Sequence, residues 1–541
     1  MANTRTSYPG QWNTFHANGP FPLRTLLDTR LEPKADMPSP TARYKDAALE
    51  IQRLLQDSLD HNERFRAYGS AWSLNNIAHQ QDRMHFNQRL NLKFGITQAQ
   101  MHAATAHAEG SLFFFQCGNL IKEVSEFARE NGRSISASGA SNGQTIAGAI
   151  STGVHGSALD FGSVQDMVVG LNLIIGPRPE DNVYIESEHA PALADAFAAS
   201  INARVIRNES LFRAALVGLG AFGFVHGVTI VTEERFLLKR YIRKIPKADA
   251  LQLGETLDFA NARFTLPEER DANGKGNRPY HYKLLINPYN AAEDYVIELM
   301  YKKPYRSGYP NPLPRVRQFL YRDVPTWIGW FAARHNRHIP RLLELMKGEI
   351  FPQNEPDVEG TIGEIFWDSN YAGPAFACSV AVDHADMGRA LDLLIHTLNT
   401  VGPIPGAIGV RFMKATKATL GFTRFPHTCI IEVDGILWPT TGGGVSLDEF
   451  NRQLDLAFMN AGIPYTHHWG KNAAWGLAGL VDHMYGNADD EWKNHRSALL
   501  TREMADLFSN DFLDTVRLSD YRATADPGLV ADRGVPGGGG G

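Results

Sequence analysis

Apolar side chains recur along this 541-residue chain with two periods, every three or four residues in some segments and every second residue in others. The first period is typical of helices that bury one face, and the second of half-buried strands. In the first half of the chain these patterns predict a helix over 44–59, a strand and a helix within 102–130, a buried strand over 164–175, a helix over 208–217 and a strand over 225–231.

From about residue 236 the pattern changes and predicts a second α+β domain, at about 236–455. Its predicted elements are a hairpin-like pair of strands at 281–290 and 294–303, a strand and a helix within 376–399, strands over 406–415 and 428–437, and a helix over 450–461. Around the two domains, we expect an N-terminal extension at 1–40, a C-terminal segment at 456–524 and a flexible glycine-rich tail at 525–541.

One predicted helical stretch, 316–346, contains tryptophans and phenylalanines together with several arginines. Trp327 and Trp330 lie in it, and an amphipathic helix on a membrane surface would have this composition. A helix that caps a substrate pocket would have it as well. Pro325 and Pro340 interrupt the helical face, which favours the cap.

The least ordinary stretch of the chain is 136–157, SASGASNGQTIAGAISTGVHGS. It contains five glycines and no charged residue, although each glycine in a helix costs about 1 kcal/mol. Small residues let a backbone approach another group closely, and free N–H groups form a cradle for an anion. Two interpretations follow: a site for the pyrophosphate of a dinucleotide, or a packing segment of small residues with glycine turns.

A second glycine pattern, Gly218-Leu-Gly-Ala-Phe-Gly223, fits the literal GxGxxG motif of Rossmann folds. That motif must follow a strand and open a helix. Here a predicted helix precedes it and the β-branched run 225–231 follows, so the order is reversed. The sequence therefore excludes a Rossmann site at this position.

Composition excludes several classes of protein. A net charge of −6 gives no indication of nucleic-acid binding, and 43% hydrophobic and 21% charged residues are ordinary for a globular protein. Cys117, Cys378 and Cys429 are far apart, which predicts neither a disulfide framework nor a metal site. No segment has the roughly 20 apolar residues of a membrane span, and the N-terminus does not resemble a secretory signal. A cytoplasmic protein is expected.

Several motifs in the same order along the chain carry a family resemblance. Gly143-Gln-Thr-Ile-Ala-Gly148 with Thr152-Gly-Val-His-Gly156 resembles the flavin-binding signature of the vanillyl-alcohol-oxidase family, and its sugar-1,4-lactone and alditol oxidases look most similar. Arg66-Ala-Tyr-Gly-Ser-Ala-Trp-Ser73 is similar to the family's pyrophosphate loop. The segment 211–230, the HWGK tetrapeptide at 468–471 and the segment 508–513 match elements that close over the flavin. The resemblance covers about 65–521.

This resemblance implies an α+β fold: a PCMH-type FAD-binding domain of two α+β subdomains at 41–235, and a substrate domain built on an antiparallel sheet. It implies one FAD without a covalent bond, because Trp72 stands where many members link a histidine, and His79 lies outside the motif. The residues expected to bind FAD are Arg66, Tyr68, Gly69, Ser70, Ala71, Trp72, Ser73, Gly139, Ala140, Ser141, Gly143, Gln144, Thr145, Gly148, Ser151, Thr152, Gly153, His155, Gly156, Gly223, Val225 and Lys471.

The implied activity is oxidation of a CH–OH group in a small-molecule alcohol, with hydride transfer to flavin N5 and re-oxidation by oxygen or another acceptor. Catalytic roles are expected for Arg411, Glu432, Lys471 and His468, with Lys471 stabilising reduced flavin. The family's Glu-x-Arg pair is Gly409-Val-Arg411 here, and Glu432 on the next strand is a candidate replacement. The alternatives are that Arg411 and Glu432 are solvated strand residues, and that the protein binds flavin but has lost alcohol oxidation.

Overall fold

The fold was analysed on a computed structural model, which describes residues 2–268, 278–290, 293–310, 323–351, 357–366, 373–439 and 445–522. The predicted tail at 525–541 lies outside these ranges. No helix in the described ranges is long and apolar enough to cross a bilayer.

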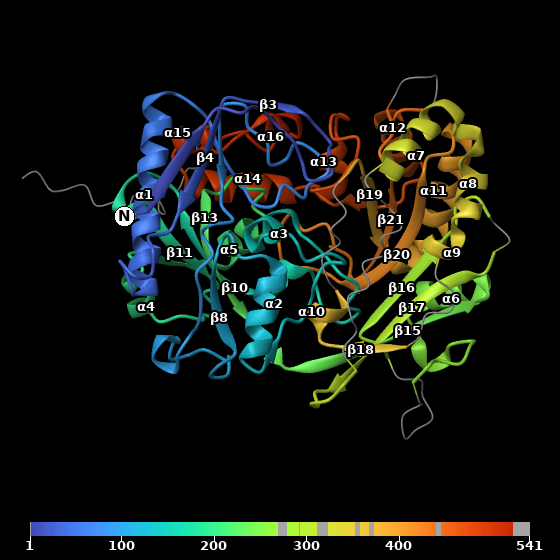
Figure 1. The fold of residues 1–541 in the computed structure, drawn as a ribbon, viewed down its shortest axis with the longest axis horizontal. Coiled ribbons are helices and arrows are strands. Elements are labelled where there is room, and N and C mark those ends of the chain that lie inside the picture. The colour runs from blue at the N-terminus through green and yellow to red at the C-terminus, as the bar shows by residue number, and fades with distance from the viewer. Residues whose placement is uncertain are drawn as a thin grey trace, which may run out of the picture.

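The N-terminal half contains two larger sheets, shown in blue and green in Figure 1. The first is mixed, and its order is β1 (Asn3–Ser7), β4 (Thr25–Arg30), β6 (Arg83–Phe86) and β5 (Phe65–Tyr68). The second has the order β12 (Arg204–Arg207), β11 (Asn182–Glu186), β10 (Val168–Ile174), β13 (Phe224–Val231), β8 (Leu112–Gln116) and β7 (Lys93–Gly95). Residues 3–30, predicted as part of an extension, thus supply two strands of the first sheet.

An eight-stranded antiparallel sheet dominates the second half (Figure 1). Its order is β18 (Val358–Gly360), β15 (Phe236–Ile245), β17 (Tyr295–Pro304), β16 (His281–Ile286), β20 (Gly406–Lys414), β21 (His427–Gly435), β19 (Phe376–Asp383) and β22 (Thr466–His467). Two small pairs, β2 (Gly10–Trp12) with β3 (Phe21–Leu23) and β9 (Arg133–Ser134) with β14 (Glu233–Glu234), complete the strands. The predicted α+β class with an antiparallel sheet is confirmed.

Helices cover both halves and match the sequence pattern closely. The predicted helices at 44–59, 208–217 and 450–461 correspond to α1, α5 and α12. Within the described ranges the α-helices are α1 (Pro40–Asp60), α2 (Ile121–Glu130), α3 (Ile146–Thr152), α4 (Asp195–Ser200), α5 (Glu209–Leu216), α6 (Lys247–Thr256), α7 (Asp323–His335), α8 (Ile339–Leu345), α9 (Lys347–Ile350), α10 (Ile362–Ile365), α11 (Met387–Val401), α12 (Leu447–Asn460), α13 (Leu480–Tyr485), α14 (Ala488–Leu499), α15 (Arg502–Leu507) and α16 (Asp511–Thr515).

Alternation along the strands gives the eight-stranded sheet two different faces. Val410 and Phe412 of β20 belong to the main hydrophobic core, and a Cβ on Gly254 of α6 would lie 3.0 Å from the Phe412 ring. Residues 407, 409 and 411 therefore point to the opposite face, toward the N-terminal half. That face, and not the helix-covered one, is available to form a site.

The segment 218–223 connects α5 to β13, so a helix precedes it and a strand follows it. This is the order on which the sequence analysis excluded a Rossmann site. Its backbone takes left-handed conformations at Gly220 and Gly223, with φ of +69° and +117°. At Gly223 a Cβ would also lie 2.8 Å from the Ile174 carbonyl oxygen. Glycine at position 223 thus allows the backbone to approach the neighbouring strand β10 closely, and it does not lie at a helix N-terminus.

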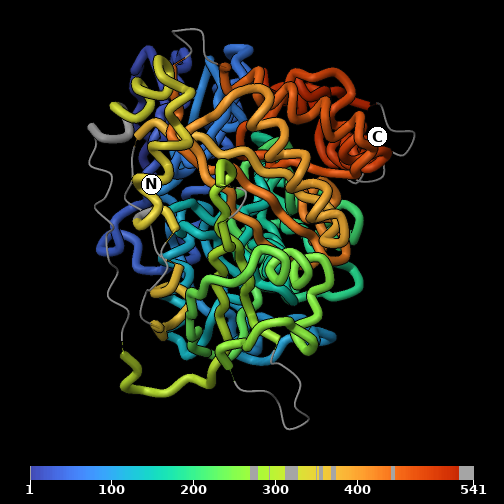
Figure 2. Tube along the Cα trace, turned by 90° about the vertical axis from the view of Figure 1, so that its right-hand side faces the viewer, coloured from blue at the N-terminus to red at the C-terminus, as the bar shows by residue number. Residues whose placement is uncertain are grey.

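The C-terminal helices return to the N-terminal strands (Figures 1 and 2). Asn510 Nδ2 donates to the carbonyl oxygens of Ile77 and His79, at 3.0 and 2.8 Å. The fully buried Arg496 donates from Nε to the Ala221 carbonyl oxygen (3.0 Å) and from Nη2 to Ser509 Oγ (2.8 Å). The Arg496 guanidinium therefore connects α14 to the turn 218–223 and to the link between α15 and α16.

Replacing Arg496 by methionine should test this connection. Buried acceptors that lose their donor cost about 1–3 kcal/mol each, so we expect Arg496→Met to lower the free energy of unfolding by at least about 3 kcal/mol. Urea unfolding gives the value. Arg502→Met, in an exposed arginine of α15, should change it by less than about 0.5 kcal/mol. Equal effects of the two variants would contradict a structural role for Arg496.

Candidate functional site

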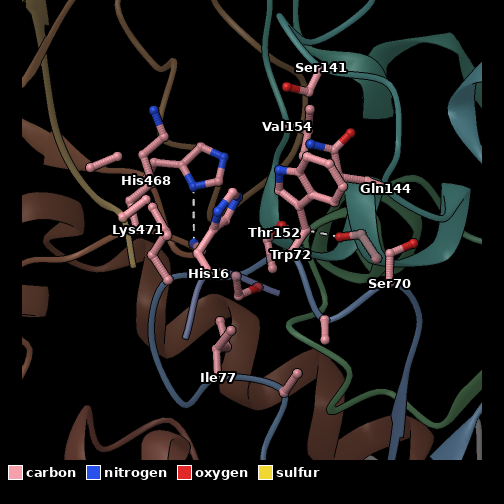
Figure 3. Close-up of a pocket in the computed structure, with 18 of the residues that line it drawn as sticks. His16, Ser70, Trp72, Ile77, Ser141, Gln144, Thr152, Val154, His468 and Lys471 are labelled. Carbon is pink, nitrogen blue, oxygen red and sulfur yellow. Dashed lines mark hydrogen bonds between the residues drawn. The ribbon is translucent and has the colours of Figure 1, made fainter. Parts of the chain in front are cut away.

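A cavity of about 680 Å³ lies between the N-terminal half and the inner face of the eight-stranded sheet. The parts of the chain that line it include the loop after β5, the glycine-rich stretch around α3, the turn before β13, the segment that contains 468–471, the ends of β19, β20 and β21, and the helices α7, α8 and α9. Figure 3 shows Trp72, Gln144, His468 and Lys471 converging on this space from different elements. The predicted cofactor motifs are thus brought together.

Most of the residues predicted to bind the cofactor line the cavity. They are Arg66, Tyr68, Gly69, Ser70, Ala71, Trp72, Ser73, Gly139, Ala140, Ser141, Gln144, Thr145, Gly148, Ser151, Thr152, His155, Gly223, Val225 and Lys471. Gly69 shows how closely the first two parts meet, because a Cβ there would lie 2.0 Å from Thr145 Oγ1. Thr145 in turn caps α3 by accepting a hydrogen bond from the Gly148 N–H.

Three predicted cofactor residues, Gly143, Gly153 and Gly156, are not among those that line the cavity. Gly153 ends α3 in a left-handed conformation, with φ of +75°, and a Cβ there would meet its nearest atoms only at 3.9 Å. A Cβ on Gly156 would lie 2.3 Å from the Ser138 carbonyl oxygen. The backbone therefore explains the glycines at 153 and 156, through a helix end and a close approach of two loop segments.

Trp72 stands at the cavity wall and is covered by the N-terminal segment. Its ring stacks on Phe15 with centroids 4.4 Å apart, and the His16 ring meets it edge-on at 5.5 Å. His79 instead bonds the Pro22 carbonyl oxygen at 2.6 Å and stacks on Phe21. His16 also lines the cavity. It was not predicted, because it lies in the N-terminal extension and belongs to no recognisable motif.

The HWGK tetrapeptide is held in place by backbone bonds to the loop after β5. Leu74 N–H donates to the Gly470 carbonyl oxygen, and Asn75 Nδ2 donates to those of Trp469 and Lys471, each at 2.8 Å. Trp469 is fully buried and donates from Nε1 to the Leu420 carbonyl oxygen at 2.8 Å. These bonds fix the backbone from which His468 and Lys471 reach the cavity.

Glu432 of β21 is fully buried beside the cavity, where groups from four segments meet its carboxylate. Arg411 Nε lies 3.0 Å from Oε2, His155 Nε2 lies 3.2 Å from Oε1, and Lys471 Nζ contacts Oε1. Ser379 Oγ donates to Oε1 at 2.9 Å. Burial raises the pKa of this carboxyl, but Arg411, Lys471 and His155 more than reverse that and hold it well below its usual range.

The interpretation of Arg411 and Glu432 as solvated strand residues is wrong, because both are buried. In the sheet, Gly409 lies directly opposite Glu432. The carboxylate missing from position 409 is thus present on the adjacent strand, in contact with Arg411. However, Arg411 lines the cavity and Glu432 does not.

A second carboxylate on the same strand, that of Asp434, does line the cavity. It follows Glu432 by two residues, so it shares the inner face, and it lies opposite Ala407. Its side chain is exposed to the cavity although it lies deep in the protein. Burial, together with the nearby Glu432, raises its pKa. The period of two along β21 was the signal that could have found it.

His468 is a neutral histidine at the cavity wall. Burial lowers its pKa well below the usual value, and Lys471 and His155 lower it further. Its Nδ1 accepts a hydrogen bond from the Gly470 N–H at 3.0 Å, which puts the ring proton on Nε2 (Figure 3). The ring can therefore donate one hydrogen bond without carrying charge.

Comparison with solved structures gave matches over nearly the whole chain. A cholesterol oxidase from B. sterolicum superposes with a TM-score of 0.65, covering 95% of this chain and 97% of that one at 13% identity. A protein described as a solvent-stable cholesterol oxidase gives 0.64 at 12% identity, covering 94% and 97%. The chain has the cholesterol oxidase fold.

Comparison with curated proteins gave shorter matches. D-arabinono-1,4-lactone oxidase of Kluyveromyces lactis is 31% identical over 124 residues, 23% of this chain and 20% of that protein. The enzyme of the same name from Debaryomyces hansenii is 25% identical over 211 residues, 37% and 33% of the two chains. The matches span a third or less of these relatives. No family model matches the chain. The predicted resemblance to this group of flavoproteins is confirmed.

Removing the charge of Glu432 should destabilise the protein. Glu432→Gln leaves Arg411 and Lys471 buried or half-buried without their counter-charge, and breaking a buried pair costs about 3–5 kcal/mol. We expect a loss of that size in the free energy of unfolding from urea titration. Glu449→Gln, in an exposed ion pair with Arg452, is the matched control and should unfold at the same urea concentration as the wild type, because water screens an exposed pair. A Glu432→Gln protein as stable as the wild type would show that the cluster is not held by this charge.

Proposed function

We propose that this protein is an FAD-dependent oxidoreductase that oxidises a CH–OH group of a small-molecule alcohol to a carbonyl. The observation that supports it best is a single cavity lined both by the glycine-rich motifs and by Arg411, Asp434, His468 and Lys471. We further propose that 41–235 holds FAD, 236–455 covers the substrate and 456–524 returns to the flavin. The lactone oxidase and cholesterol oxidase names of the relatives agree with an oxidase.

The cavity fits an anionic dinucleotide in two respects. Among the described residues, the backbone N–H groups of 70–73 and 139–141 donate no hydrogen bond, so they are available to bind an anion. Arg66 lines the same cavity, is buried, and has no carboxylate partner among the described ion pairs. Its guanidinium is fixed by carbonyl oxygens, including those of Ile77 (2.9 Å) and Phe508 (3.0 Å). Burial, with Arg496 nearby, lowers its pKa to about 9.

Bound FAD would supply the acceptor for the hydride from the carbinol carbon. The chain's own residues would then handle the hydroxyl group. Asp434 can accept the hydroxyl proton, because its raised pKa makes it a stronger base than an ordinary carboxylate. Arg411 and His468 Nε2–H can orient the oxygen. Glu432 is already neutralised by cations, so its role is to position Arg411 and Lys471.

A second candidate function, flavin binding without alcohol oxidation, rests on the glycine at position 409. The geometry weakens this alternative, because Arg411 keeps a carboxylate partner from the adjacent strand. Asp434 additionally gives the cavity a base that does not depend on position 409. Catalysis is therefore the function that the arrangement supports better.

The cofactor and the activity can be tested on purified protein. We expect a yellow protein whose colour is released into solution by acid precipitation, because Trp72 offers no nucleophile for a covalent link. Colour that remains in the pellet would contradict the non-covalent link. Anaerobic addition of an alcohol substrate should bleach the flavin. Failure of every alcohol class to bleach it would favour the binding-only alternative.

Replacement of Asp434 by asparagine should lower kcat/KM by about a hundredfold or more, which is typical for loss of a general base. In the wild type kcat/KM should fall as the pH falls through the raised pKa of Asp434, since protonation removes the base. The variant should lose this acidic limb and keep its flavin content. Asp392→Asn, on the exposed face of α11, should behave as the wild type. If kcat/KM of Asp434→Asn still falls at low pH as in the wild type, a group other than Asp434 accepts the hydroxyl proton.

A further inference from the structure

The part of the cavity that lies under the helices α7, α8 and α9 is lined mainly by apolar side chains. Its outer wall is the cap formed by α7, α8 and α9, whose described side chains in the wall are Ile328, Ile339, Leu342, Leu343, Met346 and Ile350. None of these side chains can donate or accept a conventional hydrogen bond. The cap interpretation of this segment thus agrees with the structure, while Trp327 and Trp330 are exposed on the other side of α7.

The opposite wall of this part is apolar as well. It is formed by Ala375, Phe376, Pro405, Ala407 and Ile436 at the ends of β19, β20 and β21. Backbone N–H groups at this rim are already committed: Gly406 N–H donates to the Ile404 carbonyl oxygen, and Ile436 N–H donates to that of Pro405. A ligand here would find few free polar groups on either wall.

Few polar side chains reach this chamber. Arg411 and Asp434 approach from the sheet, where Asp434 lies opposite Ala407, and His468 and Lys471 approach from the HWGK tetrapeptide. His16 lines the cavity from the N-terminal segment, beside Ala375. The chamber therefore has a few polar groups on the sheet and the HWGK tetrapeptide, and none on the described side chains of the cap. A hydroxyl on the sheet side would reach Asp434 while the rest of the molecule lies under the cap.

We propose that the substrate is an alcohol with a bulky apolar skeleton, either alicyclic or long-chain, whose single hydroxyl lies against Arg411 and Asp434. This rests on the proposed function. A polyol or a sugar lactone would bury several hydroxyl groups against the cap, where they would lose water and gain no partner. An apolar skeleton gains binding free energy for each CH₂ it buries, about a fourfold gain in affinity per group.

Anaerobic reduction of the flavin measures this preference directly. The probes are cyclohexanol and decahydro-2-naphthol on one side, and sorbitol and D-arabinono-1,4-lactone on the other. We expect the rate constant per unit concentration to rise at least tenfold from cyclohexanol to decahydro-2-naphthol, and both polar probes to be at least a hundredfold poorer than decahydro-2-naphthol. Equal or better reduction by sorbitol or the lactone would overturn the inference and leave the proposed function standing.

Two variants of α8 locate the chamber. Leu342→Asn places an amide in the cavity wall, and Leu345→Asn makes the same change on an exposed side chain of that helix, which is 77% exposed. We expect Leu342→Asn to lose at least tenfold in reduction by decahydro-2-naphthol at unchanged flavin content, and Leu345→Asn to match the wild type. Equal behaviour of the two variants would overturn the assignment of the cap as the binding wall.

A binding measurement separates this inference from the proposed function. 1-Methylcyclohexanol is a tertiary alcohol, so it has no carbinol hydrogen to lose and can only bind. We expect it to raise the midpoint of thermal unfolding of the wild type and of Leu345→Asn, and to raise it less in Leu342→Asn. Such binding without reduction by any secondary alcohol would support the chamber and contradict the proposed function. If 1-methylcyclohexanol does not raise the unfolding midpoint of the wild type and sorbitol reduces the flavin, the apolar chamber is contradicted and the proposed function is supported.

Discussion

A single buried carboxylate, that of Glu432, holds the candidate site together. Its neighbours come from three distant parts of the chain: His155 from the glycine-rich stretch, Arg411 from the adjacent strand, and Lys471 from the C-terminal segment. A buried charge is tolerated only when it is paired, so each of these segments constrains the other two. The cavity takes its shape because these segments meet at Glu432.

This constraint depends on the return of the C-terminal segment. Lys471 can reach Glu432 because Leu74 and Asn75 bond the backbone on which it lies, and because Trp469 is buried beneath it. Those bonds join the HWGK tetrapeptide to the loop that follows β5, which itself lines the cavity. The same contacts therefore position the loop after β5 and the cations around Glu432. A substitution that moves one of them should also move the other.

The order of the motifs predicted most of the fold and much of the site, but two features needed coordinates. Period-two alternation puts Glu432 and Asp434 on one face and cannot say which of them is neutralised; that depends on where Lys471 and His155 arrive. Glycine content likewise could not separate cavity glycines such as Gly69 from Gly153, which only ends a helix. The first 30 residues have no clear period, yet they supply strands and His16, because their partners lie far along the chain.

The position of Gly409 in the sheet explains how the site can lack a glutamate there. A Cβ there would meet only Lys283, at 3.8 Å, so the space would accept a larger side chain. A glutamate at 409 would, however, lie opposite Glu432 and would place two carboxylates on neighbouring strands beside one arginine. Glu432 already provides that arginine with its partner, and Asp434 provides the cavity with its carboxylate. The carboxylate that position 409 of β20 lacks is therefore present on the adjacent strand β21, which carries both Glu432 and Asp434.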